Sequence, residues 1–275
     1  MSDPLFDLSG RVAVVTGGMG QLGAEYAAGL ASRGMKVAIF DLAGEPKPGV
    51  ADVSAALADG SIRPFTVDVT DRGSLERATG EVIAAWGVPH LLVNNAGLDS
   101  PPDAPAEEVG PFEDYPEASF DRVLDVNVKG TLLCCQVVGG RMAAAGRGSI
   151  VNVSSIYGLL SPVQSLYDFR RQGGETFVKP VAYSVSKSAV LNLTRYLATY
   201  WAASGVRVNT LTLAGVANDQ PAEFVAAYTA RMPLGRMAEA SEYVGAVVFL
   251  ASDASSYVTG ANLVVDGGVL THNTW

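Results

Sequence analysis

The sequence holds few of the side chains from which disulfide frameworks and metal sites are built. Cysteine occurs only at Cys134 and Cys135, and histidine only at His90 and His272. The cysteines are neighbours in an apolar helical stretch, where one must turn away from the other, so we expect no structural disulfide. The histidines are far apart and have no nearby cysteines, so no metal site is predicted. A reducing cytoplasm is the simplest setting for such a chain.

Charged residues are also scarce, and basic residues are the minority among them. Of 275 residues 17% are charged, and 19 Lys and Arg against 28 Asp and Glu give a net charge of −9. This balance disfavours nucleic acid and anionic lipid as partners and favours a small-molecule substrate. No uninterrupted apolar run approaches the length of a membrane span, and the N-terminal segment lacks the basic start and apolar run of a secretory signal.

The chain is 48% hydrophobic and has no linker, repeat or low-complexity tract, so we expect one domain over residues 1–275. Apolar runs alternate with helical patterns along it. Strands are expected near 11–16, 36–40, 62–67, 89–94, 148–154, 206–212 and 262–266, and helices near 20–33, 71–86, 117–145, 181–203 and 240–251. This alternation predicts an α/β fold with a Rossmann-type, doubly wound parallel sheet of about seven strands and helices on both faces. Ligands of such sheets bind beyond the carboxyl ends of the strands.

A glycine-rich turn, Gly17-Gly-Met-Gly-Gln-Leu-Gly23, separates the first strand from a helical pattern. Strand, glycine turn and helix make the front half of a mononucleotide-binding unit, in which glycines let the backbone approach a pyrophosphate. The next strand ends at Asp41, whose carboxylate can accept hydrogen bonds from an unmodified ribose but repels a 2′-phosphate. NAD is therefore favoured over NADP. The alternative reading of Asp41 is a solvated carboxylate in a turn.

Tyr183 and Lys187 stand four residues apart, which places them on one face of a helix. A phenol is a poor base at neutral pH, but a nearby ammonium and the positive charge of an oxidised nicotinamide both favour the phenolate. The spacing therefore predicts an acid/base device, although Tyr and Lys also fall four apart by chance on solvated helices. Ser154 and Ser155 precede this pair, and alternation along a strand sends the two serines in different directions.

In this order along nearly the whole chain, the motifs resemble those of the short-chain dehydrogenase/reductase family. The resemblance is carried by the Thr-Gly turn, Asp68-Val69, Asn94-Asn-Ala-Gly97, Asn127, Ser155, Tyr183, Lys187 and Asp266-Gly-Gly268. It implies direct hydride transfer between a substrate carbon and the nicotinamide.

The resemblance also implies a role for each catalytic residue. Ser155 would hold the substrate oxygen, and Tyr183 would exchange the proton of that oxygen. Lys187 would lower the pKa of the phenol and bind the nicotinamide ribose. Asn127 would interrupt the hydrogen bonding of its helix and hold a water molecule on the proton path to Lys187.

The residues that the resemblance places around NAD come from the glycine turn and from the ends of successive strands. They are Gly17, Met19, Gln21, Leu22, Gly23, Asp41, Leu42, Asp68, Val69, Asn95, Ala96, Gly97, Val216 and Asn218, together with Tyr183 and Lys187. Gln21 stands where the family usually has a glycine, so a local rearrangement of the turn is expected. Asn218 stands in for the family's usual threonine, and its role stays open.

Ser155 and Tyr183 are 28 residues apart, about twice the family's usual separation. The extra segment, residues 159–179, leaves a strand end beside Ser155 and returns to the helix that carries Tyr183. We therefore expect it to form part of the substrate mouth.

Within this insertion, Arg170 and Arg171 are adjacent cations that suit a carboxylate or phosphate, and Gln164 adds a hydrogen-bonding group. These three residues are the predicted substrate contacts, together with Ser155 and Tyr183. The alternative is a surface loop whose arginines pair with Asp168 and Glu175 or contact a neighbouring subunit.

These features indicate an NAD-dependent oxidoreductase of carbohydrate metabolism that acts on a secondary alcohol or ketone of a sugar, sugar acid or polyol. The insertion and the stretch Thr194-Arg-Tyr-Leu-Ala-Thr-Tyr-Trp201 resemble bacterial sugar and sugar-acid members of the family. A homotetramer is expected, paired through residues 240–251 and 262–266, with the tail to Trp275 packed on another subunit or over a cleft. The alternatives are a non-catalytic NAD sensor or scaffold and an enzyme for steroid or acyl-thioester substrates.

Overall fold

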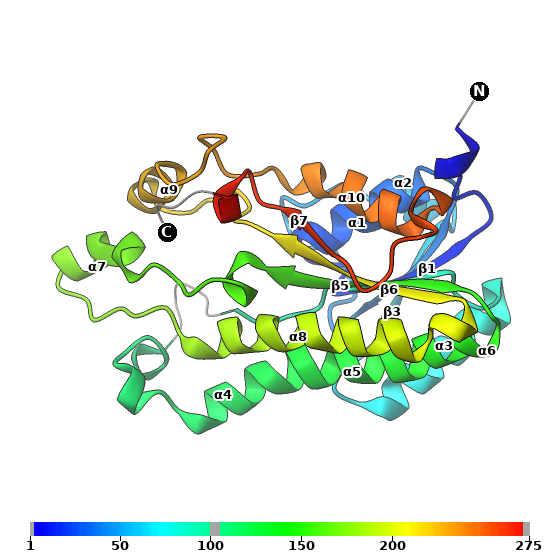
Figure 1. Ribbon diagram of the computed structural model, residues 1–275, viewed down its shortest axis with the longest axis horizontal. Coiled ribbons are helices and arrows are strands. Elements are labelled where there is room, and N and C mark those ends of the chain that lie inside the picture. The colour runs from blue at the N-terminus through cyan, green and yellow to red at the C-terminus, as the bar shows by residue number, and fades with distance from the viewer. Residues whose placement is uncertain (1–2, 100–104, 272–275) are drawn as a thin grey trace.

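The computed structural model describes residues 3–99 and 105–271 (Figure 1). Among these residues, seven strands form one parallel sheet in the order β3-β2-β1-β4-β5-β6-β7. The strands are β1 Val12–Thr16, β2 Lys36–Asp41, β3 Ile62–Thr66, β4 Leu91–Asn94, β5 Gly148–Ser155, β6 Val206–Leu213 and β7 Asn262–Val265. The predicted α/β fold is confirmed. His272 and the tail to Trp275 lie outside the described residues.

Helices cover both faces of this sheet (Figure 1). One face carries α1 Gln21–Ala31, α2 Ser54–Ala58 and α10 Val244–Ala251, and the other carries α3 Arg72–Trp86, α4 Glu117–Leu124, α5 Thr131–Cys134, α6 Gly140–Ala144 and α8 Val181–Tyr200. Two π-helical turns join α4, α5 and α6 into the continuous helix that the sequence predicts. The sequence pattern does not predict α2, α7 Asp168–Gln172 or α9 Ala222–Thr229, because helices of eight residues or fewer carry little periodic signal.

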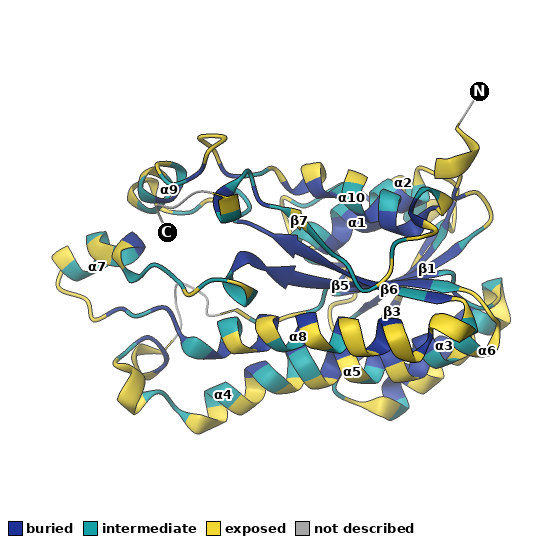
Figure 2. Cartoon of the chain, viewed as in Figure 1, coloured by how far each residue is buried: buried dark blue, intermediate teal, exposed yellow. Residues whose placement is uncertain are grey.

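Alternate residues of the strands face the two helix layers, and this buries the sheet from both sides. In β1, Ala13 and Val15 pack with residues of α1 and α10, whereas Val12 and Val14 pack with residues of α3 and α8. Figure 2 shows the strands as a buried band between helices whose outer faces are exposed. Continuous apolar runs are the expected pattern for parallel strands that are covered on both faces.

The two cysteines belong to the core on the α3 and α8 side of the sheet, where both thiols are buried and free. Burial raises the pKa of both thiols, that of Cys135 to about 12. At neutral pH they are therefore protonated and act as small apolar side chains.

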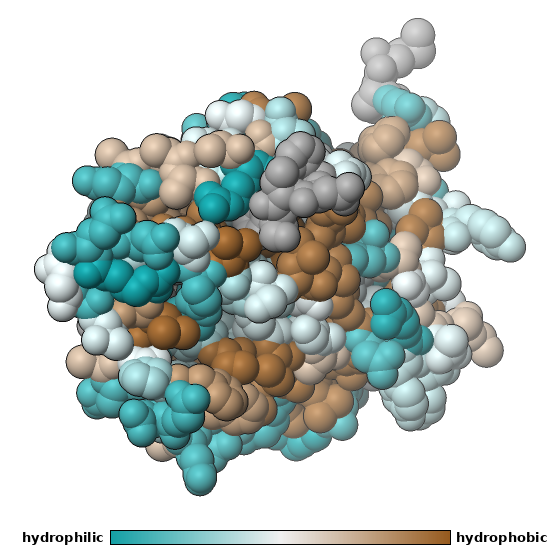
Figure 3. Space-filling model, turned by 60° about the vertical axis from the view of Figure 1, so that its left-hand side comes forward, coloured by the Kyte–Doolittle hydropathy of each residue, from teal (hydrophilic) through white to brown (hydrophobic). Residues whose placement is uncertain are grey.

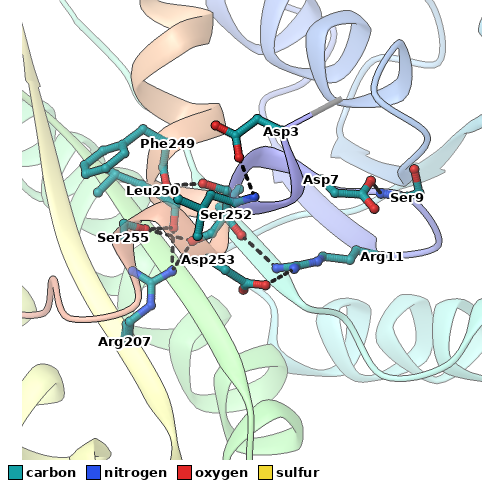
Figure 4. Close-up of polar contacts among 12 residues, drawn as sticks. Asp3, Asp7, Ser9, Arg11, Arg207, Phe249, Leu250, Ser252, Asp253 and Ser255 are labelled. Atoms are coloured by element: carbon teal, nitrogen blue, oxygen red, sulfur yellow. Dashed lines mark hydrogen bonds and ion pairs between the residues drawn. The ribbon is translucent and has the colours of Figure 1, made fainter. Parts of the chain in front are cut away.

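Two arginines fasten the amino ends of the strands to the last turn of α10 and to the segment that follows it (Figure 4). Arg207 of β6 donates to the carbonyls of Leu250 at 2.8 Å and Val258 at 3.1 Å, and Arg11 pairs with Asp253 at 2.7 Å. These contacts occupy the edge of the sheet opposite to the one where ligands of such folds bind.

The carboxyl edge of the sheet gathers the polar residues that the sequence places at strand ends. Thr16, Asp41, Asn94 and Ser155 close β1, β2, β4 and β5. The helices α7 and α9 lie beyond this edge (Figure 1), and Figure 3 turns it toward the viewer to show patches of apolar residues bordered by polar ones. The parallel sheet thus brings residues far apart in the sequence to one place.

Neither a membrane span nor a metal cluster is found in the described ranges. No helix there combines the length and hydropathy that a crossing requires, and no group of three His, Cys, Asp or Glu side chains comes together.

Candidate active site

The side chains of Tyr183 and Lys187 meet at the carboxyl end of β5. Lys187 Nζ lies 5.6 Å from the centroid of the Tyr183 ring and donates to the carbonyl of Val153 at 3.0 Å. The Ser155 hydroxyl lies close enough to the Tyr183 hydroxyl to lower the pKa of that phenol, and Ser155 Oγ accepts from the backbone N–H of Tyr157 at 3.2 Å. The sequence-predicted serine, tyrosine and lysine therefore form one cluster.

The serine pair divides between two roles. Ser155 faces the phenol, whereas Ser154 Oγ turns to α8 and donates to the carbonyl of Lys187 at 2.9 Å. Strand alternation predicts this division. Ser154 thus ties β5 to the helix that carries the cluster.

Asn127 lies in the π-helical turn Asp125–Gly130, where its side chain binds neighbouring segments. Its Oδ1 accepts from the N–H of Leu98 at 2.7 Å, and its Nδ2 donates to the carbonyl of Leu98 and to Ser186 Oγ, both at 2.9 Å. These bonds hold the segment after β4 against α8. A Cβ on Gly97 would stand 3.5 Å from Lys187 Nζ, so this segment reaches the cluster. The water that Asn127 would hold stays a prediction.

Burial controls the ionisation of the cluster in the protein alone. It raises the pKa of Tyr183 above its ordinary value, the charge of Asp99 raises it further, and the hydrogen bond from Ser155 acts in the opposite direction. Burial also lowers the pKa of Lys187 to about 8. In the protein without cofactor, burial therefore outweighs the lowering of the phenol pKa that Lys187 is predicted to give. The positive charge of an oxidised nicotinamide would add to that of Lys187 in favouring the phenolate.

A second lysine, which our sequence analysis does not predict, stands beside the same phenol. Lys179 Nζ lies 5.5 Å from the centroid of the Tyr183 ring and pairs with Asp99 at 2.6 Å. A signal for it exists, because Lys179 precedes Tyr183 by the same four residues by which Lys187 follows it. Lys179 lies just before Pro180, which is the N-cap of α8, so it is outside the helix whose spacing pairs Tyr183 with Lys187.

The insertion, residues 159–179, uses its arginines to hold its own fold. Arg171 donates to the carbonyls of Gln164 at 2.6 Å and Phe177 at 2.8 Å, and it also pairs with Asp168. Arg170 pairs with Glu175 at 2.6 Å and lies over the ring of Phe177 at 4.3 Å. These two ion pairs are the ones expected if the insertion is a surface loop. They favour a structural role for both arginines over contact with substrate.

Gln164 and Tyr167 connect the insertion to the site and to α9. Gln164 Oε1 accepts from the N–H of Lys179 at 2.9 Å, and its Nε2 donates to the Lys179 carbonyl at 3.3 Å. The Tyr167 ring lies 4.6 Å from that of Phe177 and 5.6 Å from that of Phe224, which belongs to α9. The hydroxyls of Tyr157 and Tyr167 also share a hydrogen bond. The insertion therefore packs against α9 and against Tyr157, which lies two residues after the end of β5.

The glycine turn keeps a tight, ordered backbone despite Gln21. The N–H of Gly17 donates to the carbonyl of Phe40 at 2.8 Å, and a Cβ on Gly23 would stand 2.6 Å from the Cα of Gly18 and closer still to the Gly17 carbonyl. Gln21 begins α1, and its Nε2 donates to the carbonyl of Ala217 at 2.7 Å. Gln21, which stands where the family usually has a glycine, thus adds a contact with the segment that follows β6.

Asp41 reaches across this turn from the end of β2. Its Oδ2 accepts from the N–H of Met19 and its Oδ1 from that of Ala43, each at 2.9 Å. Leu42 beside it is exposed. A carboxylate oriented at a glycine turn suits a ribose hydroxyl, so these residues fit the adenosine half of a dinucleotide.

The other predicted cofactor residues make mostly local contacts. Asp68 Oδ1 accepts from the N–H of Thr70 at 2.8 Å, which forms a turn. Asn95 Nδ2 donates to the carbonyls of Thr16 and Gly17, both at 3.1 Å, and so braces the glycine turn. Among the remaining predicted residues, Leu22 begins α1 with Gln21, Val69 is buried, Ala96 lies against Gly17, Val216 bridges to Ala238, and the N–H of Asn218 donates to Gln220 at 2.7 Å. Their contacts with a cofactor stay predictions.

A family model described as enoyl-(acyl carrier protein) reductase matches residues 18–270. The solved structure of a short-chain dehydrogenase from Leptospira borgpetersenii, with bound NAD+, is similar to this chain with a TM-score of 0.83 and 30% identity, over 98% of this chain and 96% of that one. This chain is a short-chain dehydrogenase/reductase. As a family member it is a nicotinamide-dependent oxidoreductase that acts on CH–OH groups.

Two curated relatives of this short-chain dehydrogenase/reductase are similar along almost their whole length. A cis-4-hydroxycyclohexanecarboxylate dehydrogenase of Sinomonas cyclohexanicum is 40% identical over 94% of this chain and 96% of its own. A D-threitol dehydrogenase of Mycolicibacterium smegmatis is 38% identical over 96% of this chain and 94% of its own.

Gly23→Ala should lower the free energy of unfolding by about 3 kcal/mol, because the new Cβ would overlap backbone atoms that cannot move independently. Gly20→Ala is the matched control, since a Cβ there would meet only the Gly17 carbonyl, at 3.5 Å. We expect that variant to lose less than about 1 kcal/mol. Denaturant unfolding of both variants measures the difference, and equal losses would contradict the close packing of Gly23.

Tyr183 should set the pH dependence of catalysis. Oxidation of an alcohol needs the phenolate as base, so its turnover should rise with pH through the pKa of Tyr183 in the NAD complex, and reduction of a ketone, which needs the phenol, should fall over the same range. Tyr183→Phe should abolish both reactions and keep the affinity for NADH. Tyr167→Phe removes a phenol hydroxyl from the same neighbourhood and should retain turnover of the wild-type order. Comparable turnover in the two variants would refute the assignment.

Proposed function

We propose that this short-chain dehydrogenase/reductase uses NAD to oxidise a secondary alcohol of a polyol or sugar acid, or to reduce the matching ketone, in carbohydrate metabolism. The observation that carries the proposal is the contact of Ser155 with Tyr183, beside Lys187, at the sheet edge where the glycine turn lies. The names of the two curated relatives, which act on a hydroxy acid and on a tetritol, support the substrate class.

In this mechanism the substrate oxygen lies between the hydroxyls of Ser155 and Tyr183. Ser155 donates a hydrogen bond that fixes the oxygen, and Tyr183 takes its proton in oxidation or returns it in reduction. Lys187 stays beside the phenol and keeps a positive charge near the developing phenolate. The bound nicotinamide supplies the hydride acceptor and a second positive charge. Asn127 positions the segment that carries Gly97 beside Lys187.

The same constellation speaks against a non-catalytic NAD sensor or scaffold, because a sensor needs no proton-transfer group. The steroid or acyl alternative requires an apolar cleft. The ion pair of Lys179 and Asp99 places polar groups near Tyr183, which supports a polar substrate.

The choice of NAD follows from Asp41. Its carboxylate accepts from the glycine turn at Met19 and would repel a 2′-phosphate. The next residues, Leu42-Ala-Gly44, carry no positive charge. Lys47 lies near the glycine turn, because its backbone N–H donates to the Met19 carbonyl at 3.0 Å. Its positive charge is therefore the one whose effect on the choice between NAD and NADP needs a test.

The proposed assembly is a homotetramer in the cytoplasm. On α8, Tyr196 and Tyr200 are exposed one turn apart with their rings stacked at 6.0 Å, so they form an apolar patch, and Val185 is exposed nearer the start of the helix. On the last strand of the sheet, Val264 of β7 is also exposed. Two apolar surfaces on different elements suit two kinds of two-fold contact, and two such contacts make a tetramer.

NAD should be reduced at least about tenfold more efficiently than NADP, roughly 1.4 kcal/mol, across a panel of polyols, sugar acids and simple secondary alcohols. Asp41→Ala should narrow this gap because it removes the charge that repels the 2′-phosphate. Lys47→Ala is the paired variant, and it should leave the gap unchanged. The measurement is the ratio of kcat/KM for the two cofactors. Equal use of NAD and NADP by the wild type would contradict the role of Asp41.

The mass in solution should be four times 28.6 kDa by light scattering at micromolar concentration. Tyr196→Lys with Tyr200→Lys should split the tetramer by placing charge in one of the two contacts, whereas Leu42→Lys, which is exposed at the cofactor turn, should leave the mass unchanged. A monomeric wild type would refute the proposed assembly.

A further inference from the structure

An ion pair that the catalytic roles above do not use stands beside the reacting phenol. Lys179 and Asp99 are 2.6 Å apart, yet their exposure differs greatly, with 7% of the lysine side chain and 47% of the aspartate side chain accessible. The ammonium is therefore inside the site, and the carboxylate can be reached from solution. Gln164 binds both backbone groups of Lys179 and fixes its position.

The location of this pair links it to the substrate rather than to the fold alone. Lys179 Nζ lies 5.5 Å from the centroid of the Tyr183 ring. The charge of Asp99 acts on the phenols of Tyr183, Tyr157 and Tyr167 and raises the pKa of each. A carboxylate here opposes the ionisation of Tyr183 that alcohol oxidation needs. A role in binding substrate would account for a carboxylate at a position where it opposes this ionisation.

We propose that the Lys179–Asp99 pair is a subsite that binds a hydroxyl group next to the reacting carbinol, and that it selects neutral polyols over the corresponding hydroxy acids. The inference rests on the proposed function of the site and names its substrate class. An ammonium donates hydrogen bonds and a carboxylate accepts them, so together they match a hydroxyl group, which does both.

Charge explains why a substrate carboxylate binds poorly at the same place. The ammonium of Lys179 already has a close negative partner, and the pair has no net charge. A second carboxylate on Lys179 would lie near Asp99, and because Coulomb energy falls only with the inverse of distance, the repulsion would offset much of the attraction. The desolvation of the incoming carboxylate would then be left without compensation. A hydroxyl group meets neither obstacle.

This assignment replaces the anionic substrate that Arg170 and Arg171 suggest from the sequence. Both arginines are held by groups of the insertion, whereas Lys179 lies at the phenol. Lys179 is thus the cation best placed to contact the substrate, and Asp99 already balances its charge.

The test compares a tetritol with the tetronic acid of the same stereochemistry, which differ only in a terminal CH2OH or carboxylate. With full-length enzyme and NAD, the wild type should oxidise the tetritol with a kcat/KM at least about tenfold above that of the acid. Asp99→Asn leaves the ammonium of Lys179 without its counter-charge, so the ratio should fall by about tenfold or more in favour of the acid. Asp253→Asn changes the net charge equally in an ion pair at the opposite edge of the sheet (Figure 4), and it should leave the ratio unchanged.

Lys179→Met supplies the second arm. It should raise KM for the tetritol by about tenfold while the KM of cyclohexanol, which has no neighbouring hydroxyl, stays within about twofold. The double variant Asp99→Asn with Lys179→Met removes both charges and serves if the single variant does not fold. An unchanged ratio in Asp99→Asn, or a wild type that prefers the acid, would overturn the subsite.

Failure of the proposed function would look different. If no alcohol of the panel reduced NAD, including cyclohexanol, the proposed activity would be wrong. Calorimetric titration of the tetritol and of the acid into the NADH complex then still measures which of the two ligands the Lys179–Asp99 pair prefers. Tighter binding of the tetritol that reverses in Asp99→Asn supports the subsite, and equal binding of both compounds overturns it.

Discussion

Ser154 and Lys187 join β5 to α8 by two hydrogen bonds that run in opposite directions. The serine hydroxyl donates to the backbone carbonyl of Lys187, and the lysine ammonium donates to the backbone carbonyl of Val153. Gly158 allows this close docking, because a Cβ there would stand 2.7 Å from the Lys187 carbonyl. The distance between Ser155 on the strand and Tyr183 on the helix depends on this junction, so the catalytic geometry depends on it too.

Close docking has an electrostatic consequence. It buries a phenol and two ammonium groups in a small volume, where burial raises the pKa of Tyr183 and lowers that of Lys187 to about 8. Lys187 compensates part of its desolvation with the Val153 carbonyl, and Lys179 compensates with Asp99. The site is thus poised so that one more positive charge, at the nicotinamide, favours the phenolate. Proton transfer is coupled in this way to cofactor binding.

The segments around the cluster extend the same logic to the substrate. The insertion packs on α9 through the rings of Tyr167 and Phe224, and Gln21 ties the glycine turn to Ala217 just before α9. Cofactor turn, α9 and insertion are therefore in contact through a short chain of residues. Gln164 ends that chain at Lys179, beside the phenol.

The sequence by itself determined the parallel sheet and the positions of its strands, because continuous apolar runs that alternate with helical patterns admit few arrangements. It also placed Tyr183 and Lys187 on one helix face and turned Ser154 and Ser155 in different directions, because strand alternation and a four-residue helical spacing are local geometry. The arginine contacts were decided by tertiary structure. Arg170 and Arg171 could bind a substrate or the loop that carries them, and only the folding of the loop back on Phe177 and Glu175 separates these outcomes. The same is true of Lys179 and Asp99, which are 80 residues apart in sequence and meet only because β4 ends and α8 begins at one edge of the sheet. Whether a charge is balanced depends on neighbours that the fold supplies, and no local pattern encodes them.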